Sequence, residues 1–299
     1  MTLTLQNVTK RFGTFTAVDD LSLTIPKGEV FGFLGANGSG KTTSFRIILG
    51  LLEPSEGYVT WDGQKIDYST SNIIGYLPEE RGLYPKLKVS EQVHYLASLR
   101  GMHKKDADYE LKQWLEFFDV PQYYNQKVEE LSKGNQQKIQ FITAIVHKPQ
   151  LIILDEPFSG LDPVNTDLLK KAIAMLKQAG STIVFSSHQM SNVEEMCENL
   201  CIILKGKTVI NGKLKDIKRS FGKKSVVIHA DFNLDFLEQH PLVLKYHPTT
   251  EGAQLHIADE ANASALQQEL VQKGFVRRFA LEEPSLHDIF LETVGEHFE

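Results

Sequence analysis

A glycine-rich stretch near the N-terminus, GANGSGKT at residues 35 to 42, has the residue types that hold phosphate groups. It fits the pattern G-x-x-x-x-G-K-[ST] and lies between an apolar run and a segment of helical character, as this pattern requires. Glycines let the backbone curl so that successive amides point into one concavity, and the following helix adds unpaired N–H groups. We therefore predict a nucleoside triphosphate site formed by Gly35, Ala36, Asn37, Gly38, Ser39, Gly40, Lys41, Thr42 and Thr43.

Charged and hydroxyl side chains supply the remaining chemistry of this site. Lys41 carries a positive charge for the β- and γ-phosphates, and Thr42 offers a hydroxyl ligand to Mg²⁺. Farther along, LIILDEP (151–157) has the pattern of a buried strand that ends in two carboxylates, at the edge where α/β proteins bind ligands. Asp155 is placed to hold Mg²⁺, directly or through water, and Glu156 to orient or deprotonate an attacking water. Alone, such a pair is usually a strand end followed by solvated charges; with the loop it predicts hydrolysis.

A second phosphate-binding pattern occurs at residues 128 to 140, VEELSKGNQQKIQ. Ser132, Gly134 and Asn135 stand at the start of an expected helix, from about 135 to 148, whose N-terminus favours anions. Taken alone, Ser132 is better explained as a simple N-cap. The helix has a buried face of apolar residues at helical spacing, formed by Ile139, Ile142 and Val146. One chain therefore carries two candidate phosphate-binding motifs.

The elements around these motifs alternate in the manner of an α/β protein. Three strand-like runs, LTLQNVTKRF, AVDDLSLTIP and EVFGFLG, precede the first loop. Apolar residues at helical spacing fill residues 90 to 128, and strands return at PQLIILDEP and STIVFSSH with a helix between them. This order predicts a largely parallel sheet.

The composition changes at residues 212 to 224, GKLKDIKRSFGKK, a basic stretch best explained as a solvated helix and linker. The order after it, β-α-β-β-α-β-α, predicts a small α+β domain of ferredoxin-like type. Its last helix opens with Ser285 and Asp288, which resemble a capping box. We find no catalytic cluster in this part of the sequence.

Composition excludes several classes of protein. Of 299 residues, 41% are hydrophobic and 23% charged, ordinary values for a globular protein, and the net charge of −6 argues against wholesale nucleic-acid binding. Cys197 and Cys201 are too few for a disulfide framework and are expected to be reduced, buried thiols of a cytosolic protein. The N-terminus lacks the apolar segment of a signal peptide, and no run approaches the roughly 18 to 20 apolar residues that span a bilayer.

The order GANGSGKT, LSKGNQQ, LIILDEP, SGLD and SSH resembles the nucleotide-binding subunit of an ATP-binding cassette (ABC) transporter, over residues 1 to about 215. The resemblance implies an α/β P-loop NTPase cassette with a mainly parallel core sheet, an antiparallel N-terminal β part and a helical subdomain at about 88–148. Residues 216–299 then form the small α+β domain. That domain is a regulator, a dimer stabiliser, a second permease contact or a plain stabilising appendage.

The resemblance also implies an activity and its partners. Members of this family hydrolyse ATP with Mg²⁺ and pair head to tail, each signature (here LSKGN) closing over the γ-phosphate held by the partner. The second phosphate-binding motif would thus serve the ATP of another subunit, a second copy of this chain or a paralogous ATPase. Such a dimer drives a multi-span membrane permease, so the expected location is cytoplasmic, on the inner face of the membrane.

Further roles carry over on matching positions. Phe12, in KRFG, matches the aromatic residue that stacks on adenine, with Val18 in the same pocket. Asp162, in SGLD, matches the loop that links the two active sites, and His188, in SSH, the histidine that contacts the γ-phosphate. In GYLPEERG, Glu79 occupies the position of a glutamine that touches Mg²⁺, so that Thr42, Glu79 and Asp155 are the expected metal ligands.

The sequence departs from the family pattern at the signature and at residue 79. Lys133 and Asn135 replace the usual glycine and glutamine of the signature. Glu79 should bind Mg²⁺ more strongly than glutamine, but it would repel the γ-phosphate when the metal is absent. Both departures and the C-terminal part resemble a bacterial exporter subgroup that includes the ATPases of sodium-efflux systems.

Two other functions fit a cassette ATPase. One acts on ribosomes or nucleic acid and usually carries two cassettes; here the phosphate-loop pattern occurs once, and only the basic stretch 212–224 favours it. The other is a DNA-repair cassette, which needs a long coiled coil between loop and signature that this interval is too short to contain. The transporter hypothesis predicts export of an ion, drug or peptide, with the permease docking around Leu83, Tyr84 and Leu87.

Overall fold

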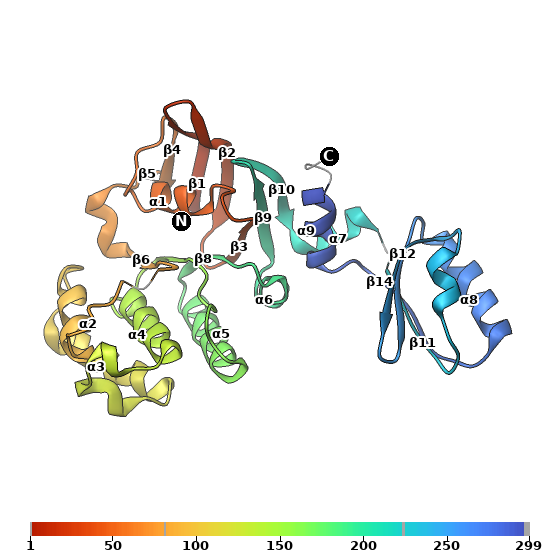
Figure 1. Cartoon of the computed structure of the whole chain (residues 1–299). Helices are drawn as coiled ribbons and strands as arrows, with labels where there is room; N and C mark the ends of the chain where they lie inside the picture. Colours follow the sequence, from red (N-terminus) through yellow and green to blue (C-terminus); the bar gives the residue numbers. More distant parts are fainter. Residues whose placement is uncertain (1, 81, 223–224, 296–299) are drawn as a thin grey trace. The chain divides into compact units, whose positions relative to one another are not determined.

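The computed structural model describes residues 2–80, 82–222 and 225–295. The chain divides into two compact units, Met1–Asn211 and Gly212–Glu299, which Figure 1 shows with the chain coloured from red to blue. The division falls between residues 211 and 212, whereas the sequence pattern placed the boundary after residue 215. Lys223 and Lys224, which end the basic stretch, and Arg81, in the expected docking segment, lie outside the described residues.

The central sheet of the first unit consists of β3 (Val30–Gly35), β6 (Ile74–Leu77), β7 (Leu151–Leu154), β8 (Thr182–Ser186), β9 (Asn199–Leu204) and β10 (Lys207–Lys213). Its order is β10-β9-β3-β8-β7-β6, and the five strands from β9 to β6 pair in parallel. Strands β3, β7 and β8 are buried along their whole length, as expected of apolar runs covered on both faces. The predicted mainly parallel core sheet is confirmed.

A second, antiparallel sheet is formed by β1 (Thr2–Phe12), β2 (Phe15–Pro26), β4 (Glu56–Trp61) and β5 (Gln64–Lys65), in the order β2-β1-β4-β5. Helix α1 (Lys41–Ile48) contributes Phe45 and Ile48 to one core that also contains residues of both sheets. The apolar faces of the two sheets therefore hold α1, the helix that follows the phosphate loop, in a fixed place.

The helical part of this unit contains α2 (Val89–Ser98), α3 (Lys104–Phe117) and α4 (Lys133–Ile145), which lie together in Figure 1. Helix α4 begins two residues before the expected start, because Ser132 is its N-cap and accepts a hydrogen bond from the Asn135 amide at 3.4 Å. Gly75 in β6 lets this helix approach the sheet closely: a Cβ at residue 75 would lie 2.2 Å from the Ala144 carbonyl oxygen.

The remaining helical segments of the first unit connect these elements. They are the 3₁₀ segments η1 (Tyr68–Ile73), η2 (Pro121–Asn125) and η3 (Val128–Glu130), and the helices α5 (Pro163–Gln178) and α6 (Met190–Met196). Cys197 and Cys201 are buried and free, as predicted, and burial raises the pKa of both thiols.

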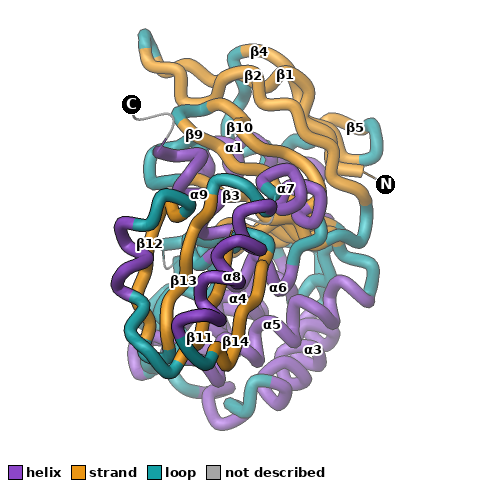
Figure 2. Tube along the Cα trace, turned by 90° about the vertical axis from the view of Figure 1, so that its right-hand side faces the viewer, coloured by secondary structure: helices purple, strands orange, loops and turns teal. Residues whose placement is uncertain are grey.

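The second unit comprises α7 (Leu214–Phe221), β11 (Ser225–Ala230), η4 (Asp235–Gln239), β12 (Val243–Thr249), β13 (Gly252–Ile257), α8 (Ala261–Lys273), β14 (Val276–Glu282) and α9 (Leu286–Gly295). Its antiparallel sheet has the order β12-β13-β11-β14, the split βαβ arrangement that the ferredoxin-like prediction requires. Helix α8 packs on this sheet (Figure 2). The capping box is confirmed: Ser285 and Asp288 each bond the other's backbone amide at 3.1 Å.

Across the described parts of the chain, no helix combines the length and the apolar character needed to cross a bilayer.

Candidate active site

The glycine-rich loop connects β3 to α1 and has little room for side chains. A Cβ at Gly35 would lie 2.3 Å from the Ser39 hydroxyl, and Gly40 has φ of +107°, a conformation that favours glycine. Lys41 folds back over the loop, and its Nζ donates to the carbonyl oxygens of Gly35 at 2.8 Å and Ala36 at 3.1 Å. The loop therefore has the tight curl that directs amides toward a bound anion.

The first unit has a hollow of about 800 Å³ beside this loop. It gathers the loop with groups from four distant parts of the chain, and its lining residues are Phe15, Ala17, Asn37, Gly38, Gly40, Lys41, Thr42, Thr43, Glu79, Glu156 and His188. Cations, hydroxyls and carboxylates from positions between 41 and 188 thus meet at one edge of the central sheet.

Asp155 directly follows β7 and is only 1% exposed. Its Oδ1 accepts a hydrogen bond of 2.6 Å from the Ser186 hydroxyl, and its Oδ2 lies 3.5 Å from Thr42 Oγ1. Burial raises the pKa of this carboxyl above its ordinary value, the Ser186 hydrogen bond opposes that rise, and the nearby charge of Glu79 adds to it. Thr42 Oγ1 and Asp155 Oδ2 are both oxygens, the ligands that Mg²⁺ takes, so these two donors fit this ion.

Glu156 is held so that its carboxylate reaches the hollow. Its backbone has φ of +51°, unusual for a residue with a side chain, and its amide donates to the Ser186 hydroxyl at 3.0 Å. His188 Nδ1 lies 2.8 Å from Glu156 Oε2, which also accepts from the His188 amide at 3.4 Å. The side chain of His188 is 67% exposed and that of Glu156 10%, so the pair presents a largely buried carboxylate and a more accessible imidazole to the same space.

Lys41 and the carboxylates balance one another. Burial lowers the pKa of the Lys41 ammonium, while the charges of Glu156, Asp155 and Glu79 oppose that change. Removing water around both signs of charge strengthens their interactions with phosphate and metal.

The two residues predicted to contact the base are not among the lining residues of the hollow. Val18 is fully buried in the core and does not line the hollow. Phe12 is half exposed at the end of β1, and its partner across the β1–β2 hairpin is Phe15. Phe15 and Ala17 line the hollow instead, because β2 runs along its rim.

The signature residues and Asp162 also lie outside this lining. Ser132 caps α4, and the Asn135 amide group donates to the Tyr123 hydroxyl at 2.8 Å. Gly134 lies near the loop before α5, at which Asp162 is the N-cap and accepts from the Asn165 amide at 2.9 Å. These hydrogen bonds from Asn165 lower the pKa of Asp162. Within one chain, the signature and the glycine loop therefore do not line the same hollow.

Ser186 is a site residue that the sequence analysis missed. Its hydroxyl donates to Asp155 and accepts from the Glu156 amide, so one side chain fixes both carboxylate residues. In sequence it is only the first serine after an apolar strand; the strand order, which places β8 beside β7, gives it this role.

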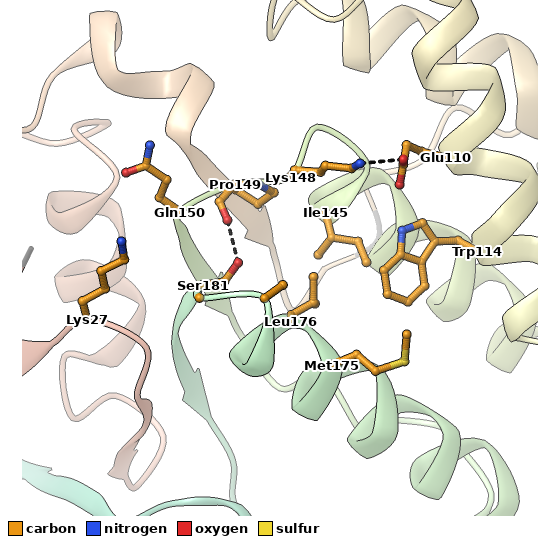
Figure 3. A pocket seen from close by; sticks show the side chains of 12 residues that line it. Lys27, Glu110, Trp114, Ile145, Lys148, Pro149, Gln150, Met175, Leu176 and Ser181 are labelled. Carbon is orange, nitrogen blue, oxygen red and sulfur yellow. Dashed lines mark hydrogen bonds and ion pairs between the residues drawn. The ribbon is translucent and has the colours of Figure 1, made fainter.

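A second hollow in the first unit, of about 510 Å³, has none of these groups (Figure 3). Trp114, Met175 and Leu176 form its apolar side, and Lys148 at the rim is paired with Glu110 at 2.7 Å.

The fold and the site together define a P-loop nucleoside triphosphatase: a parallel sheet, a glycine loop before a helix, and a buried Asp–Glu pair beside it. Comparison with known families then gives a match of residues 18–159 to the ABC transporter model. Residues 212–294 match a second model, the C-terminal domain of DrrA1-3-like ATP-binding proteins.

Curated relatives agree over most or all of the chain. An uncharacterized ABC transporter ATP-binding protein, YhaQ of Bacillus subtilis, is 60% identical over 99% of this chain and 100% of its own length. The ABC transporter ATP-binding protein NatA of the same organism is 37% identical over 73% and 92%, and the bacitracin transport ATP-binding protein BcrA of Bacillus licheniformis is 31% identical over 97% and 96%. The chain belongs to the ATP-binding subunits of ABC transporters, and it is an ATPase.

Solved structures give the same fold. An ATP-binding subunit of an ABC transporter superposes with a TM-score of 0.70 at 28% identity, covering 74% of this chain and 94% of that one. The cassette MJ0796, solved as a dimer in a post-hydrolysis state with ADP and Pi, gives 0.65 at 26% identity, covering 71% and 98%.

Asp155→Asn should make the protein without nucleotide or metal more stable at neutral pH. Because the folded-state pKa of Asp155 is raised, the folded state binds its proton more tightly than the unfolded state, and ionisation lowers stability as pH rises above the unfolded value of 3.8. Urea unfolding should show the gain at neutral pH and none below that value. Asp167→Asn, the same change at an exposed position, is the control; an equal gain there would contradict the explanation.

Proposed function

We propose that the hollow beside the glycine loop binds ATP and that Glu156 is the general base for its hydrolysis. The observation that carries this proposal is the convergence of Lys41, Thr42, Glu156 and His188 on one space. Lys41 neutralises charge on the β- and γ-phosphates, together with the amides of the loop. Glu156 accepts a proton from the attacking water, and His188, bonded to Glu156, contacts the γ-phosphate and helps to position that water.

Thr42, Asp155 and Glu79 are the proposed Mg²⁺ ligands. Thr42 and Asp155 oppose each other across 3.5 Å, and Glu79 lines the same hollow. When bound, the ion supplies charge to the β- and γ-phosphate oxygens. Ser186 keeps the Asp155 carboxylate turned toward this place, because its hydrogen bond occupies the other carboxylate oxygen.

An aromatic shelf completes the nucleotide site in this proposal. Phe12 and Phe15 face each other across the turn of the β1–β2 hairpin, both are at least half exposed, and Phe15 lines the hollow. Stacking on a ring does not read the edge of the base, so we expect only a weak preference for adenine.

The second phosphate-binding motif, the signature LSKGN, is proposed to contact the ATP of another subunit. Ser132, Gly134 and Asn135 are outside the lining of their own chain's hollow, and the related cassette MJ0796 has been solved as a dimer. Head-to-tail pairing would place the α4 N-terminus against the partner's γ-phosphate, with Asp162 in the loop that connects the two sites. The partner subunit is a second copy of this chain or a paralogous ATPase.

The dimer is proposed to drive a membrane permease that exports its substrate, and the cytoplasmic face of the membrane is where the chain would act. The relatives NatA and BcrA are named as transport proteins, and BcrA as a bacitracin transporter. An ion, a drug or a peptide remains the proposed class of substrate. The matches give no support to action on ribosomes. The second unit is proposed to regulate or stabilise the dimer; its match to the C-terminal domain of DrrA1-3-like ATP-binding proteins places similar units in related chains.

Glu156→Gln should trap ATP and lower kcat by about 10²- to 10⁴-fold, the usual effect of removing a general base. Light scattering should show a monomer that doubles in mass only with Mg²⁺ and ATP. Adding Ser132→Arg should preserve ATP binding but abolish the doubling, because the bulky side chain blocks the surface that meets the partner. A monomer under all conditions would contradict ATP-driven pairing, and a dimer without ATP would assign the holding role to the second unit.

Glu79→Gln should weaken the dependence of ATP binding and hydrolysis on Mg²⁺. The carboxylate binds the ion more strongly than an amide does, and without the ion it repels the γ-phosphate. Titration of Mg²⁺ at fixed ATP measures the effect, with Glu80→Gln, its exposed neighbour, as the control. An unchanged dependence in Glu79→Gln would remove Glu79 from the metal site.

Tyr84→Ala should reduce the membrane-bound fraction of the chain in native membranes about fivefold or more, since exposed tyrosines often dominate interfaces. Tyr84 is 50% exposed between the partly exposed Leu83 and Leu87. Quantitative sedimentation with membranes measures the fraction, and Tyr109→Ala, an exposed tyrosine on α3, is the control. Equal retention of both variants would move the docking site elsewhere.

A further inference from the structure

Helix α4 carries buried amide side chains that bond the main chain beside two residues of the nucleotide site, Glu79 and Glu156. Gln140 is 4% exposed, and its Nε2 donates to the carbonyl oxygens of Pro78 at 3.2 Å and Glu80 at 3.1 Å. These are the two residues on either side of Glu79. One amide group therefore fixes the main chain both before and after the proposed metal ligand.

The geometry leaves the Glu79 side chain little choice of direction. Glu79 belongs to the irregular segment after β6, where no sheet pairing holds the main chain. With both neighbouring carbonyls turned toward α4, Glu79 itself lines the hollow on the other side. Gly75 keeps helix and strand at backbone contact just before this point. The position of Glu79 is thus set by α4.

Stability gives no good account of the amide at residue 140. The Oε1 atom of Gln140 is buried without a hydrogen-bond partner among the described residues. A buried acceptor left in this way destabilises the folded state, because it has lost its hydrogen bonds to water without gaining others. An apolar side chain of similar size would avoid that cost, but it would also release the two carbonyls that flank Glu79.

A second amide on α4 holds the other side of the site. The Nε2 of Gln137, which is buried, donates to the Pro157 carbonyl oxygen at 3.0 Å, one residue after Glu156. Residues three apart share a helix face, so Gln137 and Gln140 project from the same side of α4. Their side-chain amides donate hydrogen bonds to the two segments that carry Glu156 and Glu79. At the far end of the Glu79 segment, the Tyr84 amide donates to Gln92 Oε1 of α2 at 2.6 Å.

We propose that Gln140 is a positioning residue that holds Glu79 at the nucleotide and thereby sets the Mg²⁺ requirement of ATP binding. This inference rests on the proposed metal role of Glu79. In this proposal α4 connects two sites. Its N-terminus carries the signature that would contact the partner's ATP, and its buried face holds the segment of its own chain that carries Glu79. Gln140 acts through Glu79 and touches neither ATP nor metal.

The test compares the affinity of the full chain for an ATP analogue carrying a fluorescent N-methylanthraniloyl group, with Mg²⁺ and with EDTA. The readout is the affinity with Mg²⁺ divided by the affinity with EDTA, and measuring it requires no ATP hydrolysis. Gln140→Met, which keeps the size but loses both hydrogen bonds, should lower the ratio about fivefold, the order expected for lost hydrogen bonds. In a Glu79→Gln background the same change should alter the ratio no further.

Lys138→Met is the matched control. Lys138 is equally buried on the same helix, but its Nζ donates to the Phe118 carbonyl at 3.2 Å, within the helical part and away from Glu79. It should leave the ratio unchanged even if it lowers the unfolding temperature. Gln140→Asn, whose shorter amide cannot span both carbonyls, is the second variant should Gln140→Met fail to fold, and it too should lower the ratio.

The outcomes separate this inference from the proposed function. If Glu79→Gln changes the ratio and neither Gln140 variant does, the positioning role is wrong while the metal role stands. An equal effect of Gln140→Met with and without the Glu79 carboxylate also overturns it. If Glu79→Gln has no effect, or the analogue fails to bind, the proposed function itself fails.

Discussion

A carboxylate buried at the end of β7 is the constraint around which the rest of the first unit is arranged. Asp155 is almost inaccessible to water, and a charge in such a place is costly unless it is paired or hydrogen-bonded. Ser186 of β8 and Lys41 and Thr42 of α1 meet this need from two different elements. The parallel sheet brings those elements to one edge, so the pairing of β7 with β8 and of β8 with β3 is a requirement of the chemistry as much as of the fold.

Two features of the same arrangement cost stability in the folded chain. Burial raises the pKa of Asp155 and so disfavours its charged form, and the left-handed backbone of Glu156 adds strain on the order of 1–3 kcal/mol. Phosphate and a divalent cation would relieve the first of these costs. Binding of Mg²⁺ and ATP should therefore stabilise the folded chain by mass action.

Sequence alone predicts those parts of the site whose chemistry is local. GANGSGKT specifies its own loop because glycine spacing, lysine and threonine are contiguous, and the succession of strands and helices along the chain follows from hydrophobic runs. Ser186, Phe15 and Gln140 escape such reasoning, because their roles depend on which strand or segment lies beside them. Val18 shows the converse: a position assigned by resemblance whose side chain is in the core.

The backbone contact between Gly75 and Ala144 has a mechanical consequence. A joint made of long side chains can absorb a small displacement by changing rotamers, whereas peptide groups in direct contact cannot. A tilt of the first turn of α4, where the partner subunit's nucleotide would bind, would therefore move β6, the strand at the edge of the sheet. No side chain between helix and strand would have to rearrange first.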